Sequence, residues 1–377
     1  MLPAKLALIV AFTVAAVMAL GGAPALATHL SCGDTITADT TLDADLVNCP
    51  NHGIVIGADD VTLDLDGHQI DGDGAPAAGC HPRRELCDVG VVNDGHDGVA
   101  VRNGSVREFD TGVLVGGARD NRVVGISSSR NRFFGIVLGG AARTVVRDSS
   151  GNDNPAPDGD GLGVFGSHHL RIVGNSFRRN GQLGMHIEDS TNNLIEGNRL
   201  SRNHDMGILM EADRNQVLRN RCVRDGACII VGPGNRNVIA QNHLFRDREG
   251  IAVEKGLGNL VAHNVVVGVR TTGIHLGVEH PPIGSTNSVV RGNLVRGTGG
   301  DAFQVSTNSA GSLLRANVAI AAGDDGFHVR GRSTRLTGNR AVRNADLGIE
   351  AVRGVIGGGN IARGNGDPRQ CTNIFCG

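Results

Sequence analysis

The sequence lacks tryptophan and tyrosine altogether, and its 377 residues include only ten phenylalanines. Lysine is almost absent as well, because Lys5 and Lys255 are the only two and arginine supplies the other 34 of the 36 basic residues. The formal net charge of −2 argues against a nucleic-acid-binding protein, which usually carries a basic excess. After the first 27 residues no apolar run is long enough to span a bilayer, which argues against a membrane-spanning protein.

The N-terminus has the pattern of a secretory signal peptide. Lys5 precedes the apolar run from Leu6 to Leu20, and Ala25-Leu26-Ala27 forms a small-x-small cleavage site. We therefore predict that residues 1–27 are removed and that the mature chain is extracellular or periplasmic, with no membrane span. The preference for arginine over lysine indicates a G+C-rich, bacterial genome.

The rest of the chain repeats with a short period. Residues 184–203 show one unit: an opening glycine, alternating apolar residues, a small polar turn, and a second apolar run that ends in asparagine. The opening glycine recurs at Gly161, Gly184, Gly207, Gly250 and Gly273, and Cys228 replaces it once. The closing asparagine recurs at Asn175, Asn198, Asn220, Asn242, Asn264, Asn293, Asn317, Asn339 and Asn360, mostly at steps of 21 to 24 residues. This period predicts an all-β solenoid of about a dozen coils, in which the asparagines stack as a ladder.

The Gly-apolar-x-apolar opening, the period and the Asn-rich turns resemble the right-handed parallel β-helix of the pectin-lyase-like superfamily. Among its members the chain most resembles the repeat proteins of the NosD type, over roughly residues 53–365. The resemblance implies one right-handed parallel β-helix domain over residues 28–377. We expect an N-terminal cap at 28–52 and a disulfide-closed tail at 361–377. The repeat motif is structural, so it predicts the fold and leaves the activity open.

Eight cysteines follow the predicted cleavage site, an even number for a chain exported to an oxidising compartment. Many pairings are possible, but contacts in a solenoid are short in sequence, so nearest-neighbour pairing is our prediction. No cysteine pair has the CxxC spacing of a zinc site. The predicted disulfides are Cys32–Cys49, Cys80–Cys87, Cys222–Cys228 and Cys371–Cys376.

Side chains of a strand alternate between faces, so the first and third residues after each opening glycine should fill the interior. Met185 and Met210 are then core residues and not copper ligands. The second and fourth residues should line one outer face, which gathers the candidate site residues His186, Glu188, Glu211, Glu254, His275, His328 and Arg330, together with Glu350. The backbones of adjacent coils lie about 4.8 Å apart, so acidic residues at one phase come close enough for cation binding or acid catalysis. The alternative interpretation is a solvated face with scattered charges, because Leu209, Ile230 and Ala252 interrupt the row.

A second candidate is Gly323-Asp324-Asp325-Gly326, followed by His328 and Arg330. It resembles the paired-aspartate motif of polygalacturonases, which implies that Asp324 and Asp325 act as acid and base. The sequence departs from that motif: no Asn-Thr-Asp precedes the pair at the expected phase, no Gly-His-Gly follows it, and Arg330-Gly331-Arg332 lacks the family's lysine. The alternative is a pair of aspartates in the turn before a strand.

Three excursions interrupt the repeat, at residues 75–88, 152–160 and 279–285. If they wall a groove on the outer face, an enzyme is favoured, whereas a flat face argues against one. Asp64 to Gly74 superficially resembles a calcium loop, but it lacks the third ligand position and the terminal glutamate. Calcium is therefore the one cofactor considered, and the sequence does not establish it.

Three functions remain open. The first is binding or cleavage of extracellular polysaccharide by a lyase or glycoside hydrolase on the outer face. The second is a non-catalytic structural or adhesion module, and the third is a periplasmic metal-delivery protein of the NosD type. Uronan epimerases and lyases of the superfamily that this chain resembles commonly use a tyrosine, and this chain has none. The sequence leaves open whether the protein is an enzyme, and it identifies neither substrate, metal nor oligomeric state.

Overall fold

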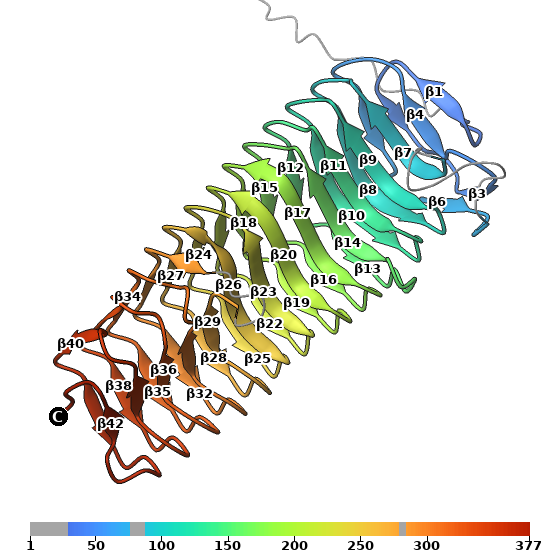
Figure 1. Ribbon diagram of the computed structural model, residues 1–377. Coiled ribbons are helices and arrows are strands. Elements are labelled where there is room, and N and C mark those ends of the chain that lie inside the picture. The colour runs from blue at the N-terminus through green and yellow to red at the C-terminus, as the bar shows by residue number, and fades with distance from the viewer. Residues whose placement is uncertain (1–28, 76–86, 279–283) are drawn as a thin grey trace, which may run out of the picture.

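The computed structural model describes residues 29–75, 87–278 and 284–377, which form a rod of about 14 stacked turns (Figure 1). Every strand pairing in these residues is parallel, and none of them is helical. The predicted right-handed parallel β-helix is confirmed, with slightly more turns than expected. Among the described residues no helix is long and apolar enough to cross a membrane.

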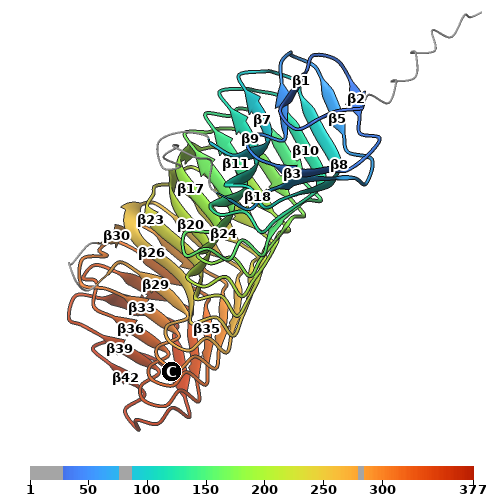
Figure 2. The same ribbon diagram turned by 90° about the vertical axis from the view of Figure 1, so that its right-hand side faces the viewer.

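Each complete coil contributes strands to three faces, and the same face of successive coils is visible along one side of the rod in Figure 2. We call one of these faces the front sheet. It contains β1 (Asp34–Ile36), β4 (Ile54–Ile56), β7 (Val89–Asp94), β9 (Thr111–Gly116), β11 (Phe134–Gly139), β14 (Asp160–Phe165), β17 (Leu183–Thr191), β20 (Met206–Asp213), β23 (Ala227–Pro233), β26 (Glu249–Leu257), β29 (Ile274–Leu276), β33 (Phe303–Val305), β36 (Phe327–Val329), β39 (Ile349–Ala351) and β42 (Cys371–Thr372). A short strand, β30 (Ser285–Thr286), pairs with the end of β26.

The other two faces share the long strands β8 (Ala100–Arg107) and β10 (Arg122–Ser129). The second face contains β2 (Thr40–Thr41), β5 (Thr62–Asp64), β12 (Val145–Arg147), β15 (Arg171–Val173), β18 (Leu194–Glu196), β21 (Gln216–Leu218), β24 (Val238–Ala240), β27 (Leu260–Ala262), β31 (Val289–Arg291), β34 (Leu313–Arg315), β37 (Arg335–Thr337) and β40 (Ile356–Gly358). The third contains β3 (Leu46–Cys49), β6 (Gln69–Gly72), β13 (Ser150–Asn152), β16 (Ser176–Arg178), β19 (Arg199–Ser201), β22 (Arg221–Val223), β25 (His243–Phe245), β28 (Val265–Val267), β32 (Leu294–Arg296), β35 (Val318–Ile320), β38 (Arg340–Val342) and β41 (Ile361–Arg363).

The interior is one continuous apolar core because the coils stack in register. Met185 of β17 pairs with Ile208 of β20, which pairs with Ile229 of β23. All three are fully buried, as is Met210. The prediction that the first and third residues after each opening glycine fill the core is therefore confirmed, including the assignment of Met185 and Met210 as core residues.

The recurring asparagines form the predicted ladder. Asn198 donates from Nδ2 to Asn220 Oδ1 (2.9 Å) and to the Ile172 carbonyl oxygen (2.9 Å), while its backbone N–H also reaches Asn220 Oδ1 (2.9 Å). The same pattern continues to Asn360. Since these side chains are buried, the ladder satisfies the polar backbone groups of the turns that they line.

Three of the four predicted disulfides are present: Cys32–Cys49, Cys222–Cys228 and Cys371–Cys376. Cys87 is also disulfide-bonded, but its predicted partner Cys80 lies outside the described residues.

The acidic segment that resembles a calcium loop is held by arginines. Asp64 Oδ2 accepts from Arg102 Nε (2.8 Å), and Asp71 makes a two-point pair with Arg107 (2.9 Å for each bond). These contacts account for both carboxylates without a metal ion.

Candidate functional site

A kink at each opening glycine brings an additional row of side chains onto the outer face of the front sheet. In β9 the register pairs Thr111 with Val89 and then resumes at Val113, so Gly112 is left out. A side chain at Gly112 would collide with the Gly135 carbonyl oxygen, 2.5 Å from the Cβ position. The residue before the glycine therefore turns outward, as Val89 does when it packs with Val92 in a small outer cluster. Strict alternation along an unbroken strand would instead direct this row inward.

A pocket of about 520 Å³ lies over the coils of β7 to β17. Its apolar floor includes Phe134 and Phe165, whose rings meet edge to face with centroids 5.7 Å apart, and Phe165 meets the His186 ring in the same way at 5.3 Å. We call it the aromatic pocket. It is lined by Cys87, Asp88, Val89, Asp110, Thr111, Phe133, Phe134, Val137, Asp158, Asp160, Phe165, Gln182 and His186.

Two excursions contribute to the walls of the aromatic pocket. Cys87 and Asp88 come from the end of the first, and Asp158 and Asp160 come from the end of the second. Of the third excursion, at residues 279–285, no described residue contributes to this pocket.

Asp88 and Asp110 form a buried carboxyl pair in the aromatic pocket. They lie on adjacent coils, where Thr111 N donates to the Asp88 carbonyl oxygen (3.1 Å). Neither carboxylate oxygen of Asp88 nor Oδ2 of Asp110 has a hydrogen-bond partner among the described residues. Burial and the neighbouring Asp110 raise the pKa of Asp88 to about 7. Burial also raises the pKa of Asp110, but Arg132 Nη1 lies 3.3 Å from its Oδ1 and favours the charged form.

Asp160 and His186 form a second pair in the pocket. Asp160 Oδ1 accepts from Leu183 N (2.8 Å), and its Oδ2 lies 3.8 Å from His186 Nδ1. Burial raises the pKa of Asp160 to about 7 and lowers the pKa of His186. The site thus holds carboxyl groups that are partly protonated near neutral pH, beside a neutral imidazole.

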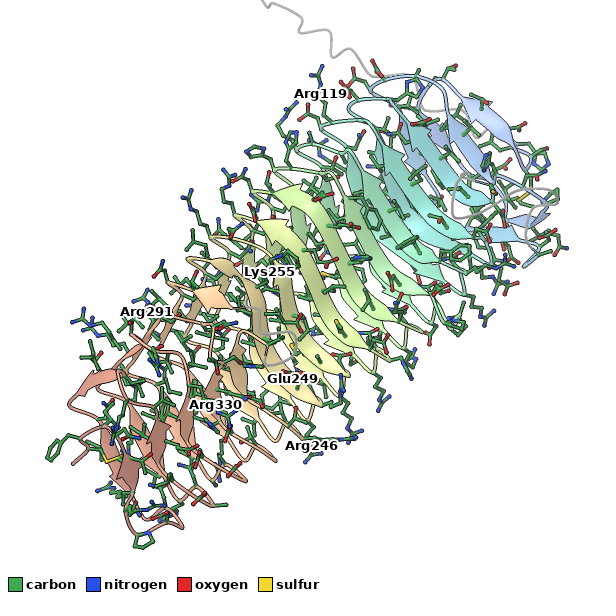
Figure 3. All side chains as sticks on the ribbon, in the orientation of Figure 1. Arg119, Arg246, Glu249, Lys255, Arg291 and Arg330 are labelled. Atoms are coloured by element: carbon green, nitrogen blue, oxygen red, sulfur yellow. A yellow bond between two sulfur atoms is a disulfide. The ribbon has the colours of Figure 1, made fainter. Side chains whose placement is uncertain are left out.

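A larger groove, of about 910 Å³, lies farther along the same edge of the front sheet. Its arginines come from consecutive turns: Arg202, Arg224, Arg246, Arg248 and Arg270. Within the described residues none of the five forms an ion pair with an acidic side chain, and Figure 3 shows Arg246 extending outward from this edge. We call it the arginine groove.

The acids of the arginine groove neutralise little of its charge. Exposed Asp205 pairs with His204 (2.8 Å), and burial raises the pKa of Asp225 to about 8, so that carboxyl stays largely protonated at neutral pH. Asp205 N also donates to the carbonyl oxygen of Gln182, a residue that lines the aromatic pocket (3.0 Å). The two hollows therefore lie on neighbouring coils, and we refer to them together as the track.

Most of the predicted outer row lies elsewhere. Glu188 pairs in register with Glu211 on the opposite edge of the front sheet, and Glu254 follows two coils beyond Glu211. Burial raises the pKa of Glu254, and the negative charge of Glu211 raises it further. His275 lies apart from these residues, with Nε2 2.8 Å from Ser306 Oγ and Nδ1 3.9 Å from Glu249. Of this row only His186 lines the aromatic pocket, and its Nε2 lies 4.0 Å from Glu211 Oε2. The structure therefore brings His186 near Glu211, while His275, His328 and Arg330 lie farther along the rod.

The second predicted candidate is a real cluster near the C-terminal end. Asp325 and His328 are close, with Asp325 Oδ2 3.6 Å from His328 Nδ1, and Arg330 Nε lies 2.9 Å from His328 Nε2. Asp324 is exposed. The structure adds an acid that motif matching missed, because Asp301 occupies the position of Asp325 in the preceding coil and accepts from Asp325 N (3.0 Å). Glu350 of the next coil also reaches His328 Nε2 (3.1 Å).

Comparisons with known families agree with this architecture. The model for the right handed beta helix region matches residues 48–223 and 158–279, and the model for the periplasmic copper-binding protein (NosD) matches residues 223–357. No curated protein matches the sequence.

Several solved structures are similar. DFA-IIIase from Arthrobacter chlorophenolicus A6, in complex with GF2, is 15% identical, with a TM-score of 0.48 over 70% of this chain and 69% of that one. A mutant tailspike protein of E. coli bacteriophage HK620, in complex with a hexasaccharide, is 12% identical, with a TM-score of 0.48 over 91% and 73%. PfbA, a surface adhesin of Streptococcus pneumoniae, is 11% identical, with a TM-score of 0.46 over 84% of each chain.

Proposed function

We propose that this protein, which belongs to the right-handed β-helix family, binds an acidic polysaccharide along the track and hydrolyses it in the aromatic pocket. The observation that carries the proposal is that phenylalanine rings lie beside the buried Asp88–Asp110 pair, in which both Asp88 oxygens and Asp110 Oδ2 lack a hydrogen-bond partner among the described residues. Apolar rings bind the flat faces of sugars, while carboxyl groups with a raised pKa supply acid and base. The arginines of the adjoining groove favour an anionic polymer.

The mechanism uses the different environments of Asp88 and Asp110. Asp88, with its pKa raised to about 7, donates a proton to the glycosidic oxygen as the leaving sugar departs. Asp110, whose charge Arg132 favours, attacks the anomeric carbon, and a water deprotonated by Asp88 then releases the sugar. Adjacent coils lie about 4.8 Å apart, near the about 5–5.5 Å separation of carboxyl groups in retaining glycosidases, so we expect retention at the anomeric carbon.

The test is incubation with acidic and neutral polysaccharides while reducing ends are counted and double-bond absorbance is followed. We expect new reducing ends from an acidic polymer without double-bond absorbance, and a loss of about 100-fold or more in Asp88→Asn and Asp110→Asn. Asp94→Asn is the matched control, because Asp94 lies exposed at the other end of β7. Binding without cleavage would favour a non-catalytic adhesion module, and double-bond formation would indicate a lyase. With neither binding nor cleavage, the proposal fails.

Affinity for the acidic polymer should depend on the unpaired arginines. We expect Arg224→Gln and Arg246→Gln each to weaken binding about tenfold or more at low salt, since hydrogen bonds to charged groups contribute about 1.5–3 kcal/mol. Arg179→Gln is the control, because Arg179 lies on the same edge but is already paired with Asp153 (2.5 Å). Titrations at several salt concentrations measure the effect, which salt should reduce. Equal losses in all three variants would remove the arginine groove from the binding surface.

The proposed location follows from chemistry. Disulfides persist in oxidising compartments, and those of this chain support an extracellular or periplasmic protein. We also propose that the N-terminus is a signal peptide and that the rest of the chain is a single domain with a cap and a tail. The functional roles of the outer-row residues are likewise proposals. The metal-delivery alternative has its own structural observation, in the C-terminal cluster.

A further inference from the structure

We propose that Asp301, Asp325 and His328 bind a divalent first-row transition metal ion through two carboxylate oxygens and one imidazole nitrogen. The three residues come from two consecutive coils near the C-terminal end of the front sheet, apart from the aromatic pocket and the arginine groove. Their potential ligand atoms all lie within 4.8 Å of one another.

The distances suit one coordination sphere. His328 Nδ1 lies 3.2 Å from Asp301 Oδ2 and 3.6 Å from Asp325 Oδ2. Ligands about 2.0–2.2 Å from a tetrahedral metal are separated by about 3.3–3.6 Å, so a metal ion placed between these atoms would need little movement of the side chains. The mixture of one imidazole with two carboxylates favours zinc, copper, iron or manganese over calcium, which takes oxygen ligands.

The ligand atoms are fixed by the coil itself. Asp301 Oδ1 accepts from Asp325 N (3.0 Å), and Asp325 Oδ1 accepts from Leu347 N (2.9 Å). Each aspartate therefore keeps its second oxygen directed at His328. The side chain of Asp325 is only 4% exposed, and its Oδ2 lies 3.6 Å from His328 Nδ1, which is beyond hydrogen-bond distance. A cation between these two atoms would offset the cost of burying the carboxylate.

The far side of the imidazole is also arranged as in metal sites. His328 Nε2 lies 3.1 Å from Glu350 Oε2, and a metal-bound histidine usually donates its other N–H to such a carboxylate. Arg330 Nε lies 2.9 Å from the same nitrogen, and a guanidinium only donates. The two contacts require different protonation states of Nε2. Metal binding at Nδ1 places the proton on Nε2 and selects Glu350.

The surrounding charge favours a cation. Asp324 and Asp346 lie beside Asp325, and their ligand atoms form a second group with it. His186 has one acid near each ring nitrogen, Asp160 at 3.8 Å from Nδ1 and Glu211 at 4.0 Å from Nε2. In the C-terminal cluster two aspartates lie within 3.6 Å of the same nitrogen, which distinguishes it from that arrangement.

The test uses full-length mature protein stripped with a chelator and titrated separately with Zn²⁺, Cu²⁺, Mn²⁺ and Ca²⁺. We expect one tight site per chain by calorimetry and elemental analysis, and Cu²⁺ should show the electron paramagnetic resonance pattern of one coordinated imidazole nitrogen. Asp301→Asn retains the oxygen that accepts from Asp325 N, so it should fold while affinity falls about tenfold or more. His328→Gln should remove the nitrogen signal.

Glu249→Gln is the matched control, because it alters an acid–histidine contact elsewhere on the front sheet and should leave the metal site unchanged. Absence of a stoichiometric site, an unchanged nitrogen signal in His328→Gln, or equal Ca²⁺ affinity would overturn the proposal. Loss of polysaccharide cleavage in Asp301→Asn without any change in metal content would assign the cluster to catalysis, and the metal proposal would again fail. Since Asp88 and Asp110 are not part of this site, its failure would leave the proposed function untouched.

Discussion

Asp225→Asn should stabilise the protein, and the gain should grow as pH rises from about 4 to about 8. Asp225 continues a ladder of buried asparagines, in which Asn203 Nδ2 donates to Asp225 Oδ1 (2.9 Å) and to the Phe177 carbonyl oxygen (3.1 Å). A carboxylate cannot donate the bonds that an asparagine at its position would make. Oδ2 of Asp225 accordingly has no partner among the described residues, and neither does Oδ2 of Asp247 in the next coil.

The sign follows from linkage. Burial raises the pKa of folded Asp225 to about 8, whereas an unfolded aspartate titrates near 3.9. Between these values the folded chain binds more protons than the unfolded chain, so the free energy of unfolding falls as pH rises. Each pKa unit corresponds to about 1.4 kcal/mol, which gives an expected gain of about 2–5 kcal/mol for Asp225→Asn at pH 8 and little at pH 4.

Denaturant unfolding at pH 4, 6 and 8 measures this difference. Asp189→Asn is the control, because Asp189 is exposed on the front-sheet side and should show no such trend. A gain that is equal at all three pH values would mean that Asp225 is not held protonated in the folded chain. Asp247→Asn should behave in the same direction, since burial raises its pKa to about 7.

The fold could be predicted because its signals are local and repeated. A glycine, two apolar residues and an asparagine recur at one phase, and each has a single role in every coil. Met185 lies in the core and Asn198 in the ladder. The residues at the same phase of the neighbouring coils do so for the same reasons. The Cys222–Cys228 disulfide also followed, because contacts within a coil are short in sequence.

The candidate site was harder to predict from the sequence, because it depends on breaks in the repeat. Alternation assumes an unbroken strand, whereas the kink at Gly112 and its equivalents turns the preceding residue outward. Asp160, Asp301 and Asp325 belong to that row, and only Asp325 was predicted. Asp88 lies at the end of an excursion whose path no periodicity describes.

The net charge of the whole chain did not reveal the arginine groove. A net charge of −2 suggests a balanced surface, but the structure separates charges that composition adds together. Arg224 and Arg246 occupy equivalent turn positions with φ of 62° and 60°, so they stack along one edge without acidic partners in the described residues. The repeat period also places these turn residues in register, so their alignment is present in the sequence.

Asn242→Ala should cause the largest loss of stability among these variants. Asn242 Oδ1 accepts from Asn220 N (2.9 Å) and Asn220 Nδ2 (3.1 Å), while its Nδ2 donates to the Val217 carbonyl oxygen (2.9 Å) and Asn264 Oδ1 (3.0 Å). Alanine removes all four bonds and leaves the buried Asn220 N–H without a partner. Each unsatisfied buried group costs about 1–3 kcal/mol, so we expect a loss of about 3–6 kcal/mol in the free energy of unfolding.

The location of the destabilised coils tests the ladder more sharply than the total loss in the free energy of unfolding. In a solenoid each coil contacts only its neighbours, so hydrogen exchange should accelerate most in the coils of Val217, Asn220 and Asn264, and least near Asn339. Gln216→Ala is the control, because Gln216 is exposed on the neighbouring strand and should change stability by less than about 0.5 kcal/mol. A loss below about 1 kcal/mol for Asn242→Ala would show that water replaces the amide. Uniform acceleration along the rod would instead show that the chain unfolds as one unit, in which case the ladder contributes to a global stability and not to the joining of neighbouring coils.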